Sequence, residues 1–248
     1  MSNQKILYVT TEMFPYNEVG SMAQAVNRMA LKKHHEGNDV RVFMPKFGAI
    51  SERKYQLHEV IRLSGMNIII NDLDQPLIIK VASLPGERLQ VYFIDNEEYF
   101  KRKQYYTDEE GKPFEDNDER AIFFARGVIE TIKKLNWVPD VVYLSGWMSV
   151  FIPIYLKYYY KSDSYFQDTK FVLSIYNEED VVLGDEVSQK LAFDNIVDVK
   201  AIEHPTTQNF VAESMGLVDE LIKGDKKLDK TLENAYKQSE TPKSELED

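Results

Sequence analysis

The first 45 residues combine a strand, a loop, a helix and a second strand, and this order constrains the fold more than any other feature. The apolar run Ile6 to Val9 contains β-branched and aromatic residues and predicts a buried strand. From Ser21 the apolar residues follow helical spacing up to Gly37, and residues 39–44 are a second predicted strand. Strand, helix and strand within about 40 residues form a βαβ unit, which predicts a parallel sheet with a right-handed crossover.

Similar patterns continue along the chain and favour an α/β fold. Residues 140–145 and 170–176 are predicted strands, and residues 116–135 are a predicted amphipathic helix. Three short β-rich runs between residues 66 and 95, separated by turn residues, predict a meander or hairpin insertion at one side of the sheet. We therefore expect a Rossmann-like, mainly parallel sheet with flanking helices.

The expected organisation is one domain, residues 1–222, followed by a tail. Residues 223–248 are charged and contain few aliphatic side chains, which predicts a disordered C-terminal segment. Residues 101–118 are polar and predict a long exposed loop, and loops of this length are often functional or mobile.

Composition argues against several classes of function. The net charge of −11 and the isoelectric point of about 5.0 argue against a nucleic acid or an anionic membrane as partner. The chain has no Cys and only four His, none with metal-binding spacing, so we expect no disulfide, no thiolate nucleophile and no metal site. No phosphate-loop or dinucleotide fingerprint is present, and we expect no cofactor. A long apolar run and a signal peptide are both missing, so the cytoplasm is the expected location.

The loop between the first strand and the first helix has the physical plan of a diphosphate site. Gly20 lies directly before the predicted helix start at Ser21. Backbone N–H groups and the positive end of the helix dipole converge at such a point.

The same loop resembles the opening loop of bacterial glycogen synthases and plant starch synthases. Residues 12–15 read Glu-Met-Phe-Pro, and the family continues with Lys-Thr-Gly-Gly-Leu-Ala-Asp. Counted without a gap, Gly20 and Ala23 match, whereas Glu18 stands at the lysine and Ser21 at the second glycine.

Two further segments resemble this family but differ from it at polar positions. The family ends one strand with His-x-His-Asp-Trp-His, and only Trp147 is kept here. Its other positions are occupied by Tyr143, Ser145, Gly146 and Met148. The family's Ile-His-Asn becomes Ile175, Tyr176 and Asn177. A histidine can donate a hydrogen bond to a sugar hydroxyl or a developing oxyanion, whereas a methionine thioether cannot.

The resemblance implies one half of a two-domain GT-B glycosyltransferase, with the active site in a cleft between the halves. It implies a nucleotide diphosphate sugar donor, commonly ADP-glucose, and a second half that supplies most donor contacts. We expect this chain to end without that half. A charge about 5 Å from a phosphate, at an effective dielectric of about 20, is worth about 3 kcal/mol. Replacing the lysine by Glu18 therefore costs about 6 kcal/mol before solvent screening or protonation reduces it. Alternatively, Glu18 points into water.

No catalytic residue is predicted, because the family positions are replaced at Glu18, Ser145, Gly146, Met148 and Tyr176. The family begins a helix with Asp-Asn-x-x-Arg-Phe, which matches residues 116, 117 and 120, although capping and a surface ion pair are the favoured roles there. The cleft aromatics suit sugar stacking or a partner surface, and ordinary packing is the alternative. The candidate ligand-binding residues are Gly20, Ser21, Tyr106, Asp116, Asn117, Arg120, Trp147 and Asn177.

Three functions compete. The favoured one is a non-catalytic relative that binds an α-glucan, a sugar nucleotide or a protein. A protein partner, a homodimer mate or the chain's own C-terminal segment would then cover the cleft face. The second is one half of a split or oligomeric ADP-glucose-dependent α-1,4-glucan glycosyltransferase. The third is an unrelated doubly wound domain for a small metabolite. The first is preferred because a split enzyme is expected to keep the lysine loop and the histidines.

Overall fold

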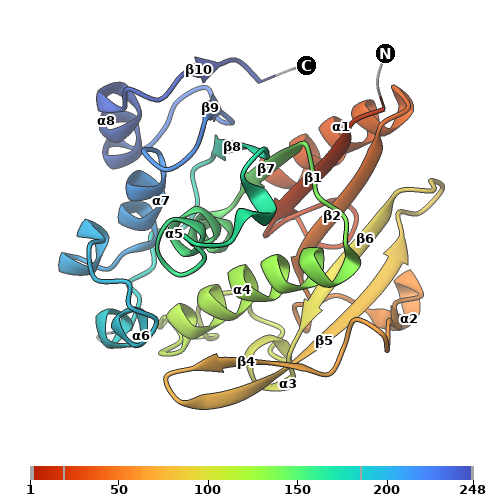
Figure 1. The fold of residues 1–248 in the computed structure, drawn as a ribbon, viewed down its shortest axis with the longest axis horizontal. Helices are drawn as coiled ribbons and strands as arrows, with labels where there is room; N and C mark the ends of the chain where they lie inside the picture. The colour runs from red at the N-terminus through yellow and green to blue at the C-terminus, as the bar shows by residue number, and fades with distance from the viewer. Residues whose placement is uncertain (1–2, 19, 185, 247–248) are drawn as a thin grey trace.

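A ten-stranded, mainly parallel sheet runs through the part of the chain that the computed structural model describes, residues 3–18, 20–184 and 186–246 (Figure 1). The strand order is β10-β9-β8-β7-β1-β2-β6-β5-β3, and β4 pairs with β5 outside this path. The strands are β1 (Lys5–Thr10), β2 (Asp39–Pro45), β3 (His58–Glu59), β4 (Met66–Ile70), β5 (Leu73–Ser83), β6 (Gln90–Asp95), β7 (Val141–Ser145), β8 (Lys170–Ile175), β9 (Glu220–Lys223) and β10 (Lys243–Ser244).

Helices connect these strands. The α-helices are α1 (Met22–His35), α2 (Glu52–Tyr55), α3 (Glu97–Phe100), α4 (Asn117–Leu135), α5 (Phe151–Tyr158), α6 (Val187–Phe193), α7 (Thr207–Ser214) and α8 (Lys230–Gln238). Short 3-10 turns are η1 (Trp147–Val150), η2 (Ser164–Phe166) and η3 (Lys200–Glu203). The predicted α/β fold class is therefore confirmed.

The predicted βαβ unit is present, and β1 is the centre of the sheet. It pairs in parallel with β2 on one side and with β7 on the other. After β1 the chain builds outward through β2 and β6, and it later returns to build β7, β8 and β9 in the opposite direction. The order of strands thus reverses between β1 and β7.

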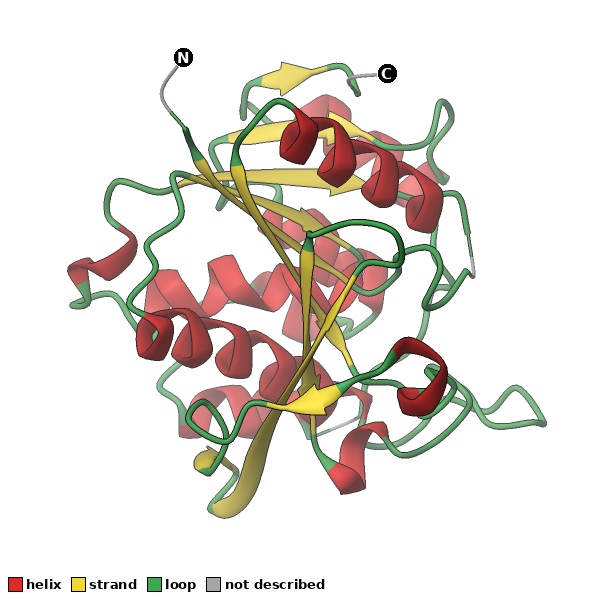
Figure 2. Ribbon diagram, turned by 90° about the vertical axis from the view of Figure 1, so that its right-hand side faces the viewer, coloured by secondary structure: helices red, strands yellow, loops and turns green. Residues whose placement is uncertain are grey.

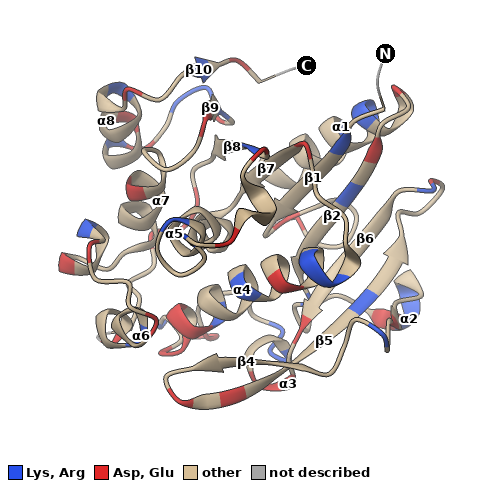
Figure 3. Cartoon of the chain, in the orientation of Figure 1, with Lys and Arg blue, Asp and Glu red and all other residues tan. Residues whose placement is uncertain are grey.

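Helices cover both faces of the sheet (Figure 2). Leu7, Val9 and Val142 share a face with α4 and α5, whereas Tyr8 and Tyr143 lie with Met29 of α1. This division follows from the two-residue repeat of a strand, which sends alternate side chains to opposite faces. Basic and acidic residues are interspersed along the elements in the view of Figure 3.

The predicted β-rich insertion forms an antiparallel β4–β5–β6 arrangement, but it is only partly an insertion. Residues 71 and 72 have φ of 46° and 66°, as a two-residue hairpin turn requires. β6 also pairs in parallel with β2, so it belongs to the central sheet. The sequence did not separate β6 from its neighbours, because all three runs have the same β-rich composition.

The expected disordered tail needs correction, because residues 223–246 contain the end of β9, helix α8 and strand β10. Leu228 and Leu232 are buried in this segment. The Nζ atom of Lys223 lies 2.7 Å from a carboxylate oxygen of Glu233. A few buried leucines therefore anchor a segment whose overall composition is polar. The sequence also missed β9, because no strand was predicted after residue 176.

A buried ion pair joins α4 to the segment after α6. The Arg126 Nη1 atom lies 3.2 Å from Asp194 Oδ2, and both side chains are less than one tenth exposed. The Tyr155 hydroxyl donates to the same oxygen at 2.7 Å. Arg126 also donates to the backbone carbonyl of Ile69 on β4, so one charged side chain links α4, α5, α6 and the hairpin.

None of the helices in the described residues is long and apolar enough to cross a membrane.

Candidate functional site

The reversal of strand order between β1 and β7 marks the place where doubly wound folds bind ligands. Ligands there occupy the crevice beyond the carboxyl ends of the strands. Three loops meet at this point. Their described residues are 11–18 and 20–21 after β1, 176–184 after β8, and 224–229 after β9. We call this region, together with residues 145–148, the edge site.

At the start of α1, two hydrogen-bond donors are bonded to carboxylates of the chain itself. The Gly20 N–H donates to Glu12 Oε2 at 2.8 Å. The Ser21 hydroxyl donates to Asp225 Oδ1 at 2.6 Å. A phosphate at this helix N-terminus would need these same donors. The two carboxylates therefore occupy the positions that the sequence assigned to an anionic ligand.

Residues 224–229 lie across the end of β8 and are held there by Asn177. The Asn177 N–H donates to Asp225 Oδ2 at 2.7 Å, and its side-chain amide donates to the Lys227 carbonyl at 2.8 Å. Its side-chain oxygen accepts from the Asp229 N–H at 2.7 Å. Asn177, a candidate ligand-binding residue, thus binds the chain's own loop.

Tyr176, which stands at the histidine of the resembled motif, is buried beneath the same loop. A Cβ atom added at Gly224 would lie 2.4 Å from its ring, so the backbone packs directly against the aromatic face. The Tyr176 hydroxyl is buried and has no hydrogen-bond partner within the described structure. The face that would stack on a sugar is covered.

The turn after β7 is closed by contact with the turn after β1. Gly146 has φ of 87° and ψ of 145°. A Cβ atom there would lie 1.9 Å from the Thr11 hydroxyl oxygen. Ser145 and Met148 are buried on either side of Gly146, and the Ser145 hydroxyl lacks a hydrogen-bond partner in the described part of the chain. No solvent-facing polar group replaces the family's cluster at these three positions.

The aromatic candidates do not form an exposed patch. Trp147 is 1% exposed and Tyr106 is 7% exposed, and their rings pack edge to face with centroids 5.3 Å apart. Met22 of α1 is also buried, and its sulfur accepts weak hydrogen bonds from Thr10 and Thr11. Ordinary packing, the alternative given by the sequence, describes these side chains.

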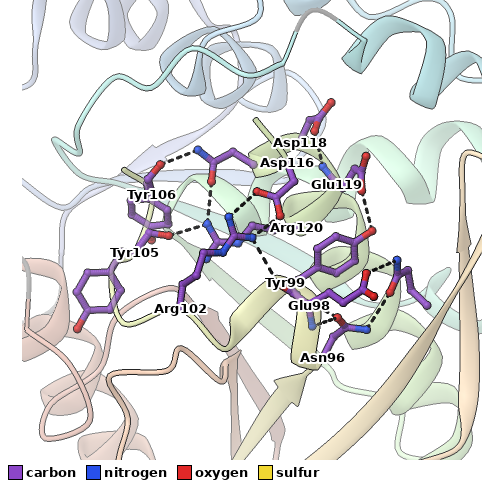
Figure 4. Close-up of polar contacts among 12 residues, drawn as sticks. Asn96, Glu98, Tyr99, Arg102, Tyr105, Tyr106, Asp116, Asp118, Glu119 and Arg120 are labelled. Carbon is purple, nitrogen blue, oxygen red and sulfur yellow. Dashed lines mark hydrogen bonds and ion pairs between the residues drawn. The ribbon is translucent and has the colours of Figure 1, made fainter. Parts of the chain in front are cut away.

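Polar residues at the start of α4 hold the loop before it (Figure 4). The Arg120 Nη1 atom donates to the Tyr105 carbonyl at 2.6 Å and to Asn117 Oδ1 at 2.8 Å. The Asn117 amide donates to the Tyr106 carbonyl at 2.8 Å. Burial, and after it the nearby Arg102, lowers the pKa of Arg120 to about 10.

The sequence favoured helix capping and a surface ion pair as the roles of Asp116, Asn117 and Arg120, and the structure contains these roles only in part. Asp116 makes no side-chain capping bond, and it pairs with Arg102 instead of with Arg120. Arg120 is completely buried, so it takes part in no surface ion pair. The loop that the sequence placed in solvent is therefore anchored from below by Asn117 and Arg120.

Glu18 is exposed, in agreement with the alternative in which it points into water. Its neighbour Val19 lies outside the described residues. No group of three or more histidine, cysteine or acidic side chains that could hold a metal is found among the residues that the structure describes.

Sequence reasoning missed Glu178, the most perturbed acid of the edge site. Burial, and after it the neighbouring Glu12 carboxylate, raises the pKa of Glu178 to about 8. Its Oε1 atom is buried without a hydrogen-bond partner in the described structure. The available signal was its position, because an acid two residues after a buried parallel strand lies at the carboxyl edge of the sheet.

Comparisons with known proteins agree with the geometry of the fold. Residues 5–230 match the family model described as starch synthase catalytic domain. A glycogen synthase from Chlorobium limicola is 38% identical over 191 residues, which cover 76% of this chain and 39% of that protein. A glycogen synthase from Chlorobium phaeobacteroides is 38% identical over 176 residues, covering 71% of this chain and 36% of that protein. The chain thus spans about two fifths of the length of these curated relatives.

A solved structure has the same fold. The catalytic domain of starch synthase IV from Arabidopsis thaliana, bound to ADP and acarbose, superposes with a TM-score of 0.69 at 15% identity. The match covers 89% of this chain and 45% of that chain.

Proposed function

We propose that this chain, which belongs to the starch synthase catalytic domain family, is a non-catalytic member of it. In this proposal the protein binds a neutral α-glucan and does not bind a nucleotide sugar. One observation carries the proposal. The two donors at the start of α1, the Gly20 N–H and the Ser21 hydroxyl, are bonded to Glu12 and Asp225.

Electrostatics supports this choice of ligand. The acidic side chains of Glu12 and Asp225 both act on Glu178 at the edge site, and Glu18 lies on the adjoining loop. A diphosphate placed there meets negative charge instead of the lysine of the resembled loop. A neutral sugar is not repelled by these carboxylates, because it has no net charge and its hydroxyl groups can donate hydrogen bonds to them.

The alternative is a working half of a split ADP-glucose-dependent glycosyltransferase. The 38% identity to glycogen synthases supports it. The absence of the motif's histidines and aspartate at Tyr143, Ser145, Gly146 and Met148 weighs against it, because removing several members of a catalytic unit loses most of its rate enhancement.

Calorimetric titration should separate these functions. We expect maltoheptaose to release or absorb heat on binding, and ADP-glucose at millimolar concentration to give none. We also expect no transfer of glucose from ADP-glucose to glycogen. Binding of ADP-glucose, or release of ADP that depends on an acceptor, by the unaltered protein would contradict the proposal. The absence of a heat signal with both ligands would favour a protein partner.

A charge variant tests the physical reason. Glu18→Lys restores the cation of the resembled loop and is expected to make binding of ADP-glucose detectable, through a gain in affinity of about tenfold after solvent screening. Glu36→Lys is the control, since Glu36 is also an exposed acid and lies at the other end of α1. An equal gain in both variants would point to net charge alone.

A further inference from the structure

Residues 224–229, which join β9 to α8 (Figure 1), are bonded to the ends of two other elements. The N–H of Gly224 donates to the Ile175 carbonyl at 2.8 Å, where β8 ends. Asp225 accepts from the Ser21 hydroxyl at the start of α1. Leu228 is 4% exposed and anchors the segment in the hydrophobic core. We call residues 224–229 the strap.

Asn177 is the main polar partner of the strap. Its backbone N–H donates to Asp225 Oδ2 at 2.7 Å, and its side-chain NH2 group donates to the Lys227 carbonyl at 2.8 Å. Its side-chain oxygen accepts from the Asp229 N–H at 2.7 Å. An amide side chain offers donors and an acceptor to a sugar as readily as to a protein backbone. While the strap is closed, it engages each of these polar groups of Asn177.

Three buried hydroxyl groups share one face of the sheet at this edge. Ser174 and Tyr176 are two residues apart along the chain, and Ser145 of β7 pairs with Ser174 in register, so their side chains point the same way. The three side chains are 1%, 4% and 1% exposed, and none of their hydroxyl groups has a hydrogen-bond partner within the described structure. A Cβ atom at Gly224 would lie 2.4 Å from the ring carbon that carries the Tyr176 hydroxyl. The closed strap therefore covers this hydroxyl without satisfying it.

The groups that the strap covers fit a neutral sugar. Buried polar groups normally have a hydrogen-bond partner, and sugar hydroxyls can both donate and accept. The Tyr176 ring adds an aromatic face, and Asn177 adds an amide once the strap releases it. An anionic ligand meets the carboxylates of Glu12 and Asp225 at the same edge. The strap thus lies where a neutral α-glucan finds its best partners.

We propose that the strap is an autoinhibitory segment, which competes with an α-glucan for Asn177 and Tyr176. The glucan binds when the strap lifts from the end of β8. The closed strap lowers the apparent affinity in proportion to the fraction of molecules that are open. This inference rests on the proposed function, because the ligand is the same neutral glucan, and it adds a subsite and the regulation of that subsite.

Loosening the strap should strengthen glucan binding. Leu228→Ala removes the apolar anchor of the strap and none of the polar groups that would contact a sugar. We expect the Kd for maltoheptaose, measured by calorimetric titration of the full chain, to fall at least about tenfold. Leu232→Ala is the matched control, because Leu232 is 2% exposed and lies in α8, outside the strap. The control variant should bind maltoheptaose with the affinity of the unaltered protein.

The outcomes separate the strap from the proposed function. Tighter binding by Leu228→Ala alone supports the strap. Equal affinities of the two variants, when the unaltered protein binds maltoheptaose, would overturn the strap and leave the proposed function standing. Binding by none of the three proteins would overturn both.

A second measurement needs no variant. Bound ligands usually slow amide hydrogen exchange, whereas here maltoheptaose should speed it at two strap amides. The Gly224 and Asp229 N–H groups lose their acceptors, the Ile175 carbonyl and the Asn177 side chain, when the strap lifts. We expect their exchange to become at least about tenfold faster at saturating maltoheptaose. The Lys46 amide, which donates to a carbonyl of β6, is the internal reference. Unchanged or slower exchange at both strap amides in the glucan-bound protein would overturn the proposal even if Leu228→Ala failed to fold.

Discussion

Replacing Gly146 with alanine is expected to lower the free energy of unfolding by about 2–6 kcal/mol, a large part of the stability of a typical domain. Two costs add. The backbone at Gly146 has φ of 87° and ψ of 145°, which is essentially restricted to glycine and costs a substituted residue about 1–3 kcal/mol. The new Cβ atom would also lie 1.9 Å from the Thr11 hydroxyl, and such overpacking costs about 1–3 kcal/mol or more.

Urea unfolding followed by circular dichroism measures this loss, and Gly111→Ala is the matched control. Gly111 has φ of 82°, but a Cβ atom there meets nothing within 4 Å. It should therefore show only the backbone cost, about 1–3 kcal/mol. Equal losses in the two variants would mean that the contact with Thr11 contributes nothing.

Breaking the buried pair of Arg126 and Asp194 is expected to cost about 3–5 kcal/mol. Asp194→Ala leaves the Arg126 guanidinium buried without its carboxylate, and it also removes the acceptor of the Tyr155 hydroxyl. The exposed pair of Lys101 and Glu97, at 73% and 79% exposure, is the control, because solvent screens such a pair and its loss changes stability little.

The double variant Arg126→Met with Asp194→Ala separates pairing from packing. If the cost comes from a stranded charge, the double variant is expected to be more stable than the additive sum of the single losses by at least about 1 kcal/mol. The free energies of unfolding of all four proteins give this coupling. Additive losses would show that the two side chains stabilise the fold separately.

Local patterns predicted most of the fold. β1, α1 and β2 were predicted close to their observed bounds, because their apolar spacing depends on the element itself and on one buried face. β9 and β10 were missed, since each is short and gains stability mainly from pairing with a neighbour that is distant in sequence. In α8, a buried Leu232 fixes the helix although its surroundings are charged.

The candidate site was less predictable, because its key contacts join residues that are far apart in the chain. Ser21 and Asp225 are 204 residues apart, and nothing in either local sequence indicates the hydrogen bond between them. Trp147 was correctly placed after a parallel strand and Tyr176 at the end of another, but residue type alone did not show that both side chains would be buried. Glu178 lay at the predicted edge, and only the burial of its Oε1 atom distinguishes it from its exposed neighbour Glu179.

The ends of the sheet have a consequence for aggregation. The path of strands ends at β10 and at β3, each only two residues long. Strand β4 pairs outside that path, and the Arg126 side chain of α4 donates a hydrogen bond to the backbone carbonyl of Ile69 on this strand. Long unpaired edges allow another chain to add a strand and start a fibre, and short or covered edges prevent it. Any self-association of this protein is therefore expected to use side-chain surfaces, and concentrated solutions should resist amyloid-like growth.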